Sequence, residues 1–279
     1  MDRRKLILII ISIVVIAFAF SLLNNEEEIV VSPIDIEVGQ EFTGINYSSP
    51  KLVLNYKIAD LNGDTVNDVV IFVGEKASAD DTNVKNADVV FYDGALQKYI
   101  NADLKKFEGD TARLELADLT GDSLDDIVAI LSNESGDKTI RVVTLMNEAL
   151  KEIFKAKDNK YITFTGNFID GFKVNVNNRK LNVNKELDLS NNSQSLIENG
   201  VFDNSGKYLQ SNNSKIKTTG FVEFEFVQLT GSMGLKTKQR IVTSDDKNII
   251  DEISIIWKYE EGKWQIKEAI GLKLGNLLY

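Results

Sequence analysis

The sequence predicts an all-β protein, and three observations support this fold class. First, β-branched and other apolar residues gather in short runs, such as 69–73 and 127–131, which are typical of strands. Second, the 279 residues include only two prolines, so Gly, Asn and Asp must make the turns between these runs. Third, no apolar stripe at helical spacing after residue 23 is longer than about two turns. We therefore expect many strands joined by tight turns.

The N-terminal part differs from the rest in composition. Residues 6–23 carry no charge and follow a basic tip at residues 1–5. A helix of that length spans roughly 27 Å, close to a bilayer core, and basic residues before it favour a cytoplasmic N-terminus. We therefore predict a single-pass cell-membrane anchor, a stalk at residues 24–34 and an extracytoplasmic β-repeat domain at residues 35–279. A signal peptide is the alternative, because Ala17-Phe18-Ala19 has the small-x-small form of a cleavage site.

The composition excludes several classes of function. The chain has no cysteine and no histidine, so it cannot form a disulfide, a Ser-His-Asp or Cys-His nucleophilic site, or an ordinary zinc site. The formal net charge is −10, which argues against nucleic acid as a partner. The predicted partners are the membrane, through residues 6–23, and a protein or glycan ligand.

Two nine-residue segments, 60–68 and 118–126, have the most informative pattern. Each carries carboxylates at positions 1, 5 and 9 and a side-chain oxygen at position 3, directly before an apolar run. Alternating oxygen donors in a tight loop suit calcium, so we predict one or two calcium ions in all. The predicted ligands, with Val66 and Leu124 acting through their carbonyls, are Asp60, Asn62, Asp64, Val66, Asp68, Asp118, Thr120, Asp122, Leu124 and Asp126.

A second interpretation of these loops needs no metal. Asx-rich turns also form when the side chains accept hydrogen bonds from the loop's own N–H groups. An EF-hand is excluded, because Ile71 occupies the twelfth position, where a bidentate glutamate is needed. Position 6 is Thr65 in one loop and Ser123 in the other. If that position requires a positive φ, each loop carries strain of about 1 kcal/mol, which lowers calcium affinity.

The loops also mark a repeat. A third copy of the Leu-Thr-Gly core, at residues 229–231, has lost the acids and is predicted to be purely structural. A tight turn follows each loop, near residues 93, 147 and 261. One unit is therefore loop, strand, connection, strand, hairpin and strand, with a degenerate unit between residues 155 and 217. Such units predict a propeller-like domain of about four to five degenerate blades.

The loops resemble the calcium loops of FG-GAP/VCBS repeats, which form integrin alpha-chain propellers and occur in many bacterial surface proteins. The family loop reads Asp-x-Asn-x-Asp-Gly-x-x-Asp. The first loop matches four of its ligand positions and the second matches three, with Thr120 at the fourth. The chain also resembles membrane-anchored VCBS-repeat proteins of Gram-positive bacteria. The resemblance is good over residues 52–154 and weak over residues 218–270, and it implies calcium-stabilised blades.

Other candidates are weaker. Trp257, Tyr259 and Trp264 suit a sugar-stacking platform, but cross-strand packing in a hairpin explains them more simply. We expect the pairs Asp80-Asp81 and Asp245-Asp246 to be solvated loop charges. The sequence thus favours a non-catalytic, calcium-binding adhesion or scaffold module of the cell envelope. The alternatives are a polysaccharide-acting enzyme that uses Asp or Glu as acid and base, and a structural subunit of a membrane complex.

Overall fold

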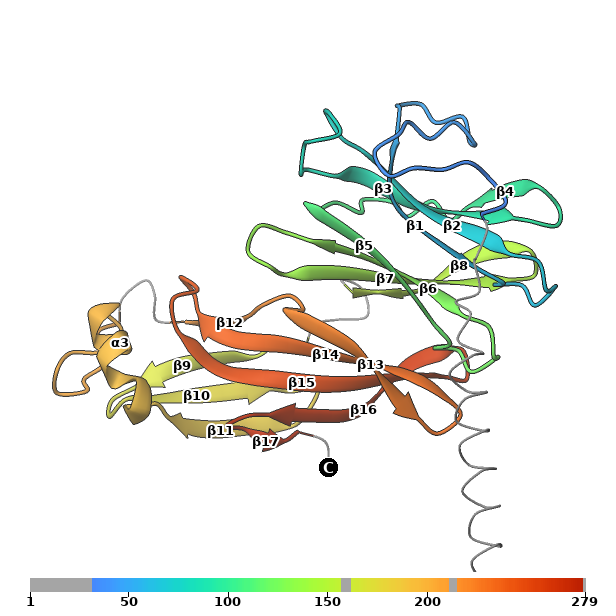
Figure 1. Ribbon diagram of the computed structural model, residues 1–279. Helices are drawn as coiled ribbons and strands as arrows, with labels where there is room; N and C mark the ends of the chain where they lie inside the picture. The colour runs from blue at the N-terminus through green and yellow to red at the C-terminus, as the bar shows by residue number, and fades with distance from the viewer. Residues whose placement is uncertain (1–31, 157–161, 211–214, 278–279) are drawn as a thin grey trace, which may run out of the picture. The chain divides into compact units, whose positions relative to one another are not determined.

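A computed structural model describes residues 32–156, 162–210 and 215–277 (Figure 1). The predicted cytoplasmic tip and membrane anchor, residues 1–23, lie outside the described residues, as does most of the predicted stalk. Within the described ranges, no helix has the length and apolar character needed to cross a membrane.

The predicted all-β class is confirmed, with 54% of the described residues in strands and 4% in helices. The described strands form four antiparallel sheets, and none of the sheets closes on itself. The first sheet contains β1 (Leu52–Ala59), β2 (Asp68–Glu75), β3 (Lys85–Asp93) and β4 (Lys98–Asn101) in that order. The second sheet contains β5 (Thr111–Ala117), β6 (Asp126–Ser132), β7 (Lys138–Met146) and β8 (Ala149–Lys155).

The second half of the chain forms the other two sheets. A three-stranded sheet contains β9 (Thr165–Ile169), β10 (Lys173–Asn178) and β11 (Val183–Asp188), and two short helices follow it, η1 (Ser190–Asn192) and α3 (Ser193–Glu198). The C-terminal sheet contains β12 (Ile216–Thr218), β13 (Glu223–Leu229), β14 (Ser232–Thr243), β15 (Ile249–Glu260), β16 (Lys263–Gly271) and β17 (Gly275–Asn276). Both β12 and β13 pair with the long strand β14.

The apolar runs that predicted strands become central strands buried on both faces. In β2, Val70 and Phe72 join one hydrophobic cluster, whereas Val69 and Ile71 join another. This division follows from the two-residue period of a strand, which turns successive side chains to opposite faces. A strand with apolar residues at every position therefore requires a packed layer on each side.

Three hydrophobic clusters occupy the spaces between the layers. The first cluster lies on the outer face of the first sheet. Residues 32–51, called here the cover segment, contribute Ile36 and Phe42 to it. The second lies between the first and second sheets and includes Phe72, Phe91 and Ala129. The largest joins the other face of the second sheet to the three-stranded and C-terminal sheets.

The predicted order of the repeat unit is confirmed by strand pairing in three places. Antiparallel neighbours follow the order β2–β3–β4, β6–β7–β8 and β14–β15–β16. The hairpins fall at residues 93–98, 146–149 and 260–263. Asn147 and Glu148 have φ values of 52° and 59°, as a primed hairpin turn requires. The degenerate region between residues 155 and 217 instead forms the three-stranded sheet and the two short helices.

Candidate functional site

The first acidic loop is closed by its own carboxylates. Oδ1 of Asp60 accepts a hydrogen bond from the N–H of Gly63 (2.7 Å), and Oδ2 accepts one from the N–H of Thr65 (2.8 Å). Oδ1 of Asn62 accepts from the N–H of Asp64 (2.9 Å). Oδ1 of Asp64 accepts from the N–H of Val66 (2.8 Å). The side-chain oxygens predicted as ligands therefore turn inward over the loop, as successive Asx turns.

Asp68 ends the first loop and fixes it to the neighbouring hairpin. Its carboxylate is fully buried and accepts hydrogen bonds from the N–H groups of Leu61 (3.0 Å) and Gly94 (3.0 Å). Burial raises the pKa of Asp68, and these two hydrogen bonds partly oppose that shift. The loop that enters β2 is thus tied to the turn between β3 and β4.

The second loop repeats this construction. The carboxylate of Asp118 accepts from the N–H groups of Gly121 (2.6 Å) and Ser123 (3.1 Å). Oδ1 of Asp122 accepts from the N–H of Leu124 (3.0 Å).

Asp126 is buried and accepts hydrogen bonds from the backbone of the second loop, as Asp68 does in the first loop. Its Oδ2 accepts from the N–H groups of Leu119 (2.9 Å) and Thr120 (2.8 Å). Burial raises the pKa of Asp126 to about 6. The hydroxyl of Thr120 is buried without a hydrogen-bond partner among the described residues.

At position 6 of each loop the backbone has a positive φ, which is the condition under which the sequence predicted strain. Thr65 has φ 69° and Ser123 has φ 72°. Side chains with a Cβ disfavour this left-handed region by roughly 1 kcal/mol or more. Each loop therefore carries the predicted local strain.

The two loops and the third Leu-Thr-Gly copy lie against one another in chain order. A Cβ placed on Gly63 would lie 3.4 Å from Cδ2 of Leu124, and one placed on Gly121 would lie 2.8 Å from the carbonyl oxygen of Gly231. The N–H of Met233 donates to the carbonyl of Asp118 (2.9 Å). The third copy is a tight hairpin turn between β13 and β14, and it packs against the second acidic loop.

A cleft of about 400 Å³ opens beside the first acidic loop, between the β3–β4 and β7–β8 hairpins. Asn62 and Asp64 of the first loop and Leu124 of the second line it, together with the β3–β4 and β7–β8 hairpins. Its full lining is Leu61, Asn62, Asp64, Phe91, Asp93, Ala95, Leu96, Lys98, Ile100, Leu124, Leu145, Asn147 and Glu148. The hairpin residues were not predicted as part of a site, although their turn positions were visible in the sequence.

The structure gives the metal prediction no independent support. Among the described residues, no three Asp or Glu side chains form a group that could hold a metal ion. The donors of each loop do share one short turn, and their hydrogen bonds are those of the metal-free alternative. Calcium binding therefore stays a prediction.

The aromatic residues near the C-terminus form packing contacts, as the simpler interpretation held. Tyr259 and Trp264 are directly opposite each other across the β15–β16 hairpin, with ring centroids 5.6 Å apart. Trp257 is 3% exposed and donates from Nε1 to the hydroxyl of Thr237 (2.9 Å). Phe154 of β8 contacts both Trp257 and Trp264.

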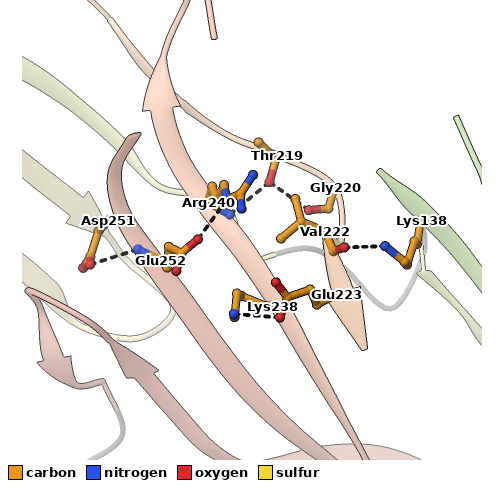
Figure 2. Close-up of polar contacts among 9 residues, drawn as sticks. All are labelled: Lys138, Thr219, Gly220, Val222, Glu223, Lys238, Arg240, Asp251 and Glu252. Carbon is orange, nitrogen blue, oxygen red and sulfur yellow. Dashed lines mark hydrogen bonds and ion pairs between the residues drawn. The ribbon is translucent and has the colours of Figure 1, made fainter. Parts of the chain in front are cut away.

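A row of ion pairs crosses the C-terminal sheet (Figure 2). Lys238 of β14 pairs with Glu223 of β13 (2.7 Å), and Arg240 pairs with Glu252 of β15 (2.9 Å). Lys138 of the second sheet donates to the carbonyl of Val222, which links two parts of the chain distant in sequence (Figure 2). These exposed or half-exposed pairs contribute little individually, so we assign them to sheet pairing.

The fold and its loops define an all-β chain of antiparallel meander sheets, with two acidic turns set side by side. Residues 162–270 match the YybI C-terminal domain family. The match begins before β9 and ends within β16, so it covers less than half of the chain. Comparisons with curated proteins and with solved structures gave no match.

The family match shows that the predicted FG-GAP/VCBS membership is wrong. The matched family is a different one, and it falls on the part of the chain where the resemblance was weak or absent. The resemblance depended on the spacing of Asx residues in two loops. That spacing also suits turns that close on their own N–H groups, so it does not identify a family.

Proposed function

We propose that this chain is a non-catalytic binding module of the cell envelope. In this proposal residues 6–23 anchor it in the membrane, with the N-terminus cytoplasmic, and residues 35–279 face outward. The sheets β1–β4 and β5–β8 are two degenerate blade-type units that offer their loops to a protein or glycan ligand. The observation that supports the proposal is the cleft of about 400 Å³ beside the first acidic loop and the two hairpins, since a cleft of this size with mixed polar and apolar lining suits a ligand.

Calcium has a structural role in this proposal. Oδ1 of Asp64 and Oδ1 of Asp122 each accept a hydrogen bond from an N–H group of their own loop. We assign Oδ2 of each residue as the donor to the ion. The ion would stiffen the turns beside the cleft in a chain that has no disulfide. Calcium outside cells fills such sites even when Kd is about 10⁻⁴ M.

The structure makes a sharp test of calcium binding possible. In the variants Asp64→Asn and Asp122→Asn, the amide oxygen still accepts the loop N–H while the charge is lost. We expect calcium at about 100 times its Kd to raise Tm of the wild type by about 5 °C or more, and to raise Tm of the double variant much less. In chelator the two proteins should melt together, and Asp80→Ala should behave as wild type throughout. Equal calcium shifts in all three proteins, or none, would show that the loops bind no calcium.

The binding role is tested by replacing residues 6–23 with a cleavable signal. Retention of the released chain on isolated envelope glycan or on an envelope protein supports the binding module. Turnover of that glycan would show an enzyme instead. Loss of every interaction with the envelope would favour a subunit whose anchor is its main contact.

A further inference from the structure

A second cavity, of about 490 Å³, lies at the end of β2 remote from the acidic loops. It forms where the cover segment crosses the outer face of the first sheet. Its lining is polar apart from one leucine and consists of Tyr47, Ser48, Ser49, Lys51, Glu75, Asn86, Asp88, Asn101, Asp103, Leu104, Lys105 and Lys106.

A buried ion pair, Lys51 with Asp88, holds the wall of this cavity. The side chains of Lys51 and Asp88 are only 6% and 8% exposed. Nζ of Lys51 also donates to the carbonyl of Asn86 (2.6 Å), and Oδ1 of Asp88 accepts from the N–H of Leu104 (2.6 Å). The ammonium lies 4.2 Å from the ring centroid of Tyr47. Both charges are therefore compensated within the protein, and the wall is fixed before any ligand arrives.

Two residues of the lining, Tyr47 and Asn101, each carry a buried polar atom without a hydrogen-bond partner in the described part of the chain. The hydroxyl of Tyr47 and Oδ1 of Asn101 are buried and form no hydrogen bond to any described residue. Leaving such groups unsatisfied destabilises the folded chain. Burial, with Asp88 and Asp103 nearby, raises the pKa of Tyr47, so its phenol stays protonated. A movement of these side chains toward the cavity on binding would offer a ligand one hydroxyl, which donates or accepts, and one acceptor that needs a donor.

Three residues that line this cavity have a strained backbone. Asn86, Asp103 and Lys106 all have positive φ, at 45°, 49° and 56°, and all three line the cavity. Non-glycine residues in this region persist where surrounding structure holds them, often at ligand sites.

The charges of the lining indicate which class of ligand fits the cavity. Its three lysines are balanced by three acids, Glu75, Asp88 and Asp103, so neither an anion nor a cation is favoured overall. A neutral ligand rich in hydroxyl groups supplies donors and acceptors together, which the unpartnered atoms require. We propose that this cavity binds a saccharide unit, an inference that rests on the proposed role as an envelope binding module.

The test uses the purified full-length chain in detergent and simple sugars as probes. N-Acetylglucosamine oligomers and neutral disaccharides should show saturable binding by calorimetry, at roughly millimolar Kd. Asn101→Ala should weaken binding about tenfold, the loss of one good hydrogen bond, without lowering Tm. Ser48→Ala is a second variant at the exposed rim, and it should also weaken binding. Asn83→Ala, an exposed residue outside the lining, should leave binding unchanged.

Three outcomes would overturn the proposal. These are no sugar binding by the folded chain, binding that Asn101→Ala and Ser48→Ala leave unchanged, or binding of inorganic phosphate in place of sugars. If free sugars bind and Asn101→Ala weakens them while envelope glycan is not retained, the cavity assignment stands and the envelope role is wrong.

Discussion

At the scale of single residues, the two acidic loops contain a strain that substitution can remove. Thr65 and Ser123 are exposed and have φ near 70°. Glycine enters this region freely but gains more entropy on unfolding, which offsets part of the benefit. We expect Thr65→Gly and Ser123→Gly to raise the free energy of unfolding by about 0.5 kcal/mol each in urea titrations. Thr111→Gly, at an exposed strand position, should lower it; a similar loss in the loop variants would contradict the strain.

Another residue-scale prediction concerns the buried ion pair. Lys51→Met leaves the carboxylate of Asp88 buried without its counter-charge, which costs about 3–5 kcal/mol of stability. Adding Asp88→Asn should restore much of that loss, because the amide oxygen still accepts from the N–H of Leu104 and no charge remains. Urea unfolding of the single and double variants measures both effects. A double variant no more stable than Lys51→Met would show that the pair does not act through charge.

At the scale of elements, Asp251 joins β15 to the segment after β16. Its carboxylate accepts from the N–H groups of Lys273 (2.8 Å) and Leu274 (3.0 Å). Burial raises the pKa of Asp251 above its ordinary 3.8, although these hydrogen bonds oppose the shift. Because the folded pKa is the higher one, this contribution to stability is complete below about pH 3.8 and is lost as pH rises through the folded value.

The stability difference between wild type and Asp251→Asn should therefore fall as pH rises from 3 to 7 in urea titrations. Asp188→Asn provides a control of opposite sign. Hydrogen bonds from Ser190 lower the pKa of Asp188, so the corresponding difference should rise with pH. Parallel pH profiles for the two variants would refute the assignment of Asp251.

Local sequence signals predicted some elements well and others not at all. The hairpins at residues 93, 147 and 261 were predictable, because Asp-Gly, Asn-Glu and Glu-Gly stand between apolar runs. The helix α3 was not, because its Ser-Gln-Ser sequence has turn-like residues and only Leu196 is buried. That helix forms through tertiary packing of Leu196, which no local pattern reports.

The candidate sites, like the elements, were only partly predictable from local sequence signals. The acidic loops were found because all their donors lie within nine residues. The cavity beside Lys51 was not found, since its walls come from residues 47–51, the start of β3 and the chain after β4. Their proximity depends on the cover segment lying over the first sheet, which is set by burial of Ile36 and Phe42.

At the scale of the whole molecule, the matched C-terminal region shares its core with the second sheet. Phe154 of β8 lies 5.1 Å from Trp264 and 6.1 Å from Trp257 between ring centroids. We expect Phe154→Ala to cost about 3–5 kcal/mol and to shift tryptophan fluorescence and circular dichroism melting curves together. Leu272→Ala, at a residue 77% exposed, should change stability by less than about 0.5 kcal/mol. Separate transitions for the two signals in the variant would show that the sheets do not unfold as one unit.

The cover segment also has a consequence for assembly. A stack of sheets exposes an apolar face at its end unless another segment covers that face. An uncovered face of this kind would associate with the same face of another molecule. Ile36 and Phe42 occupy that position over Val69, Ile71 and Val90. We therefore expect residues 32–51 to act as an end cap that keeps this face from associating with another molecule.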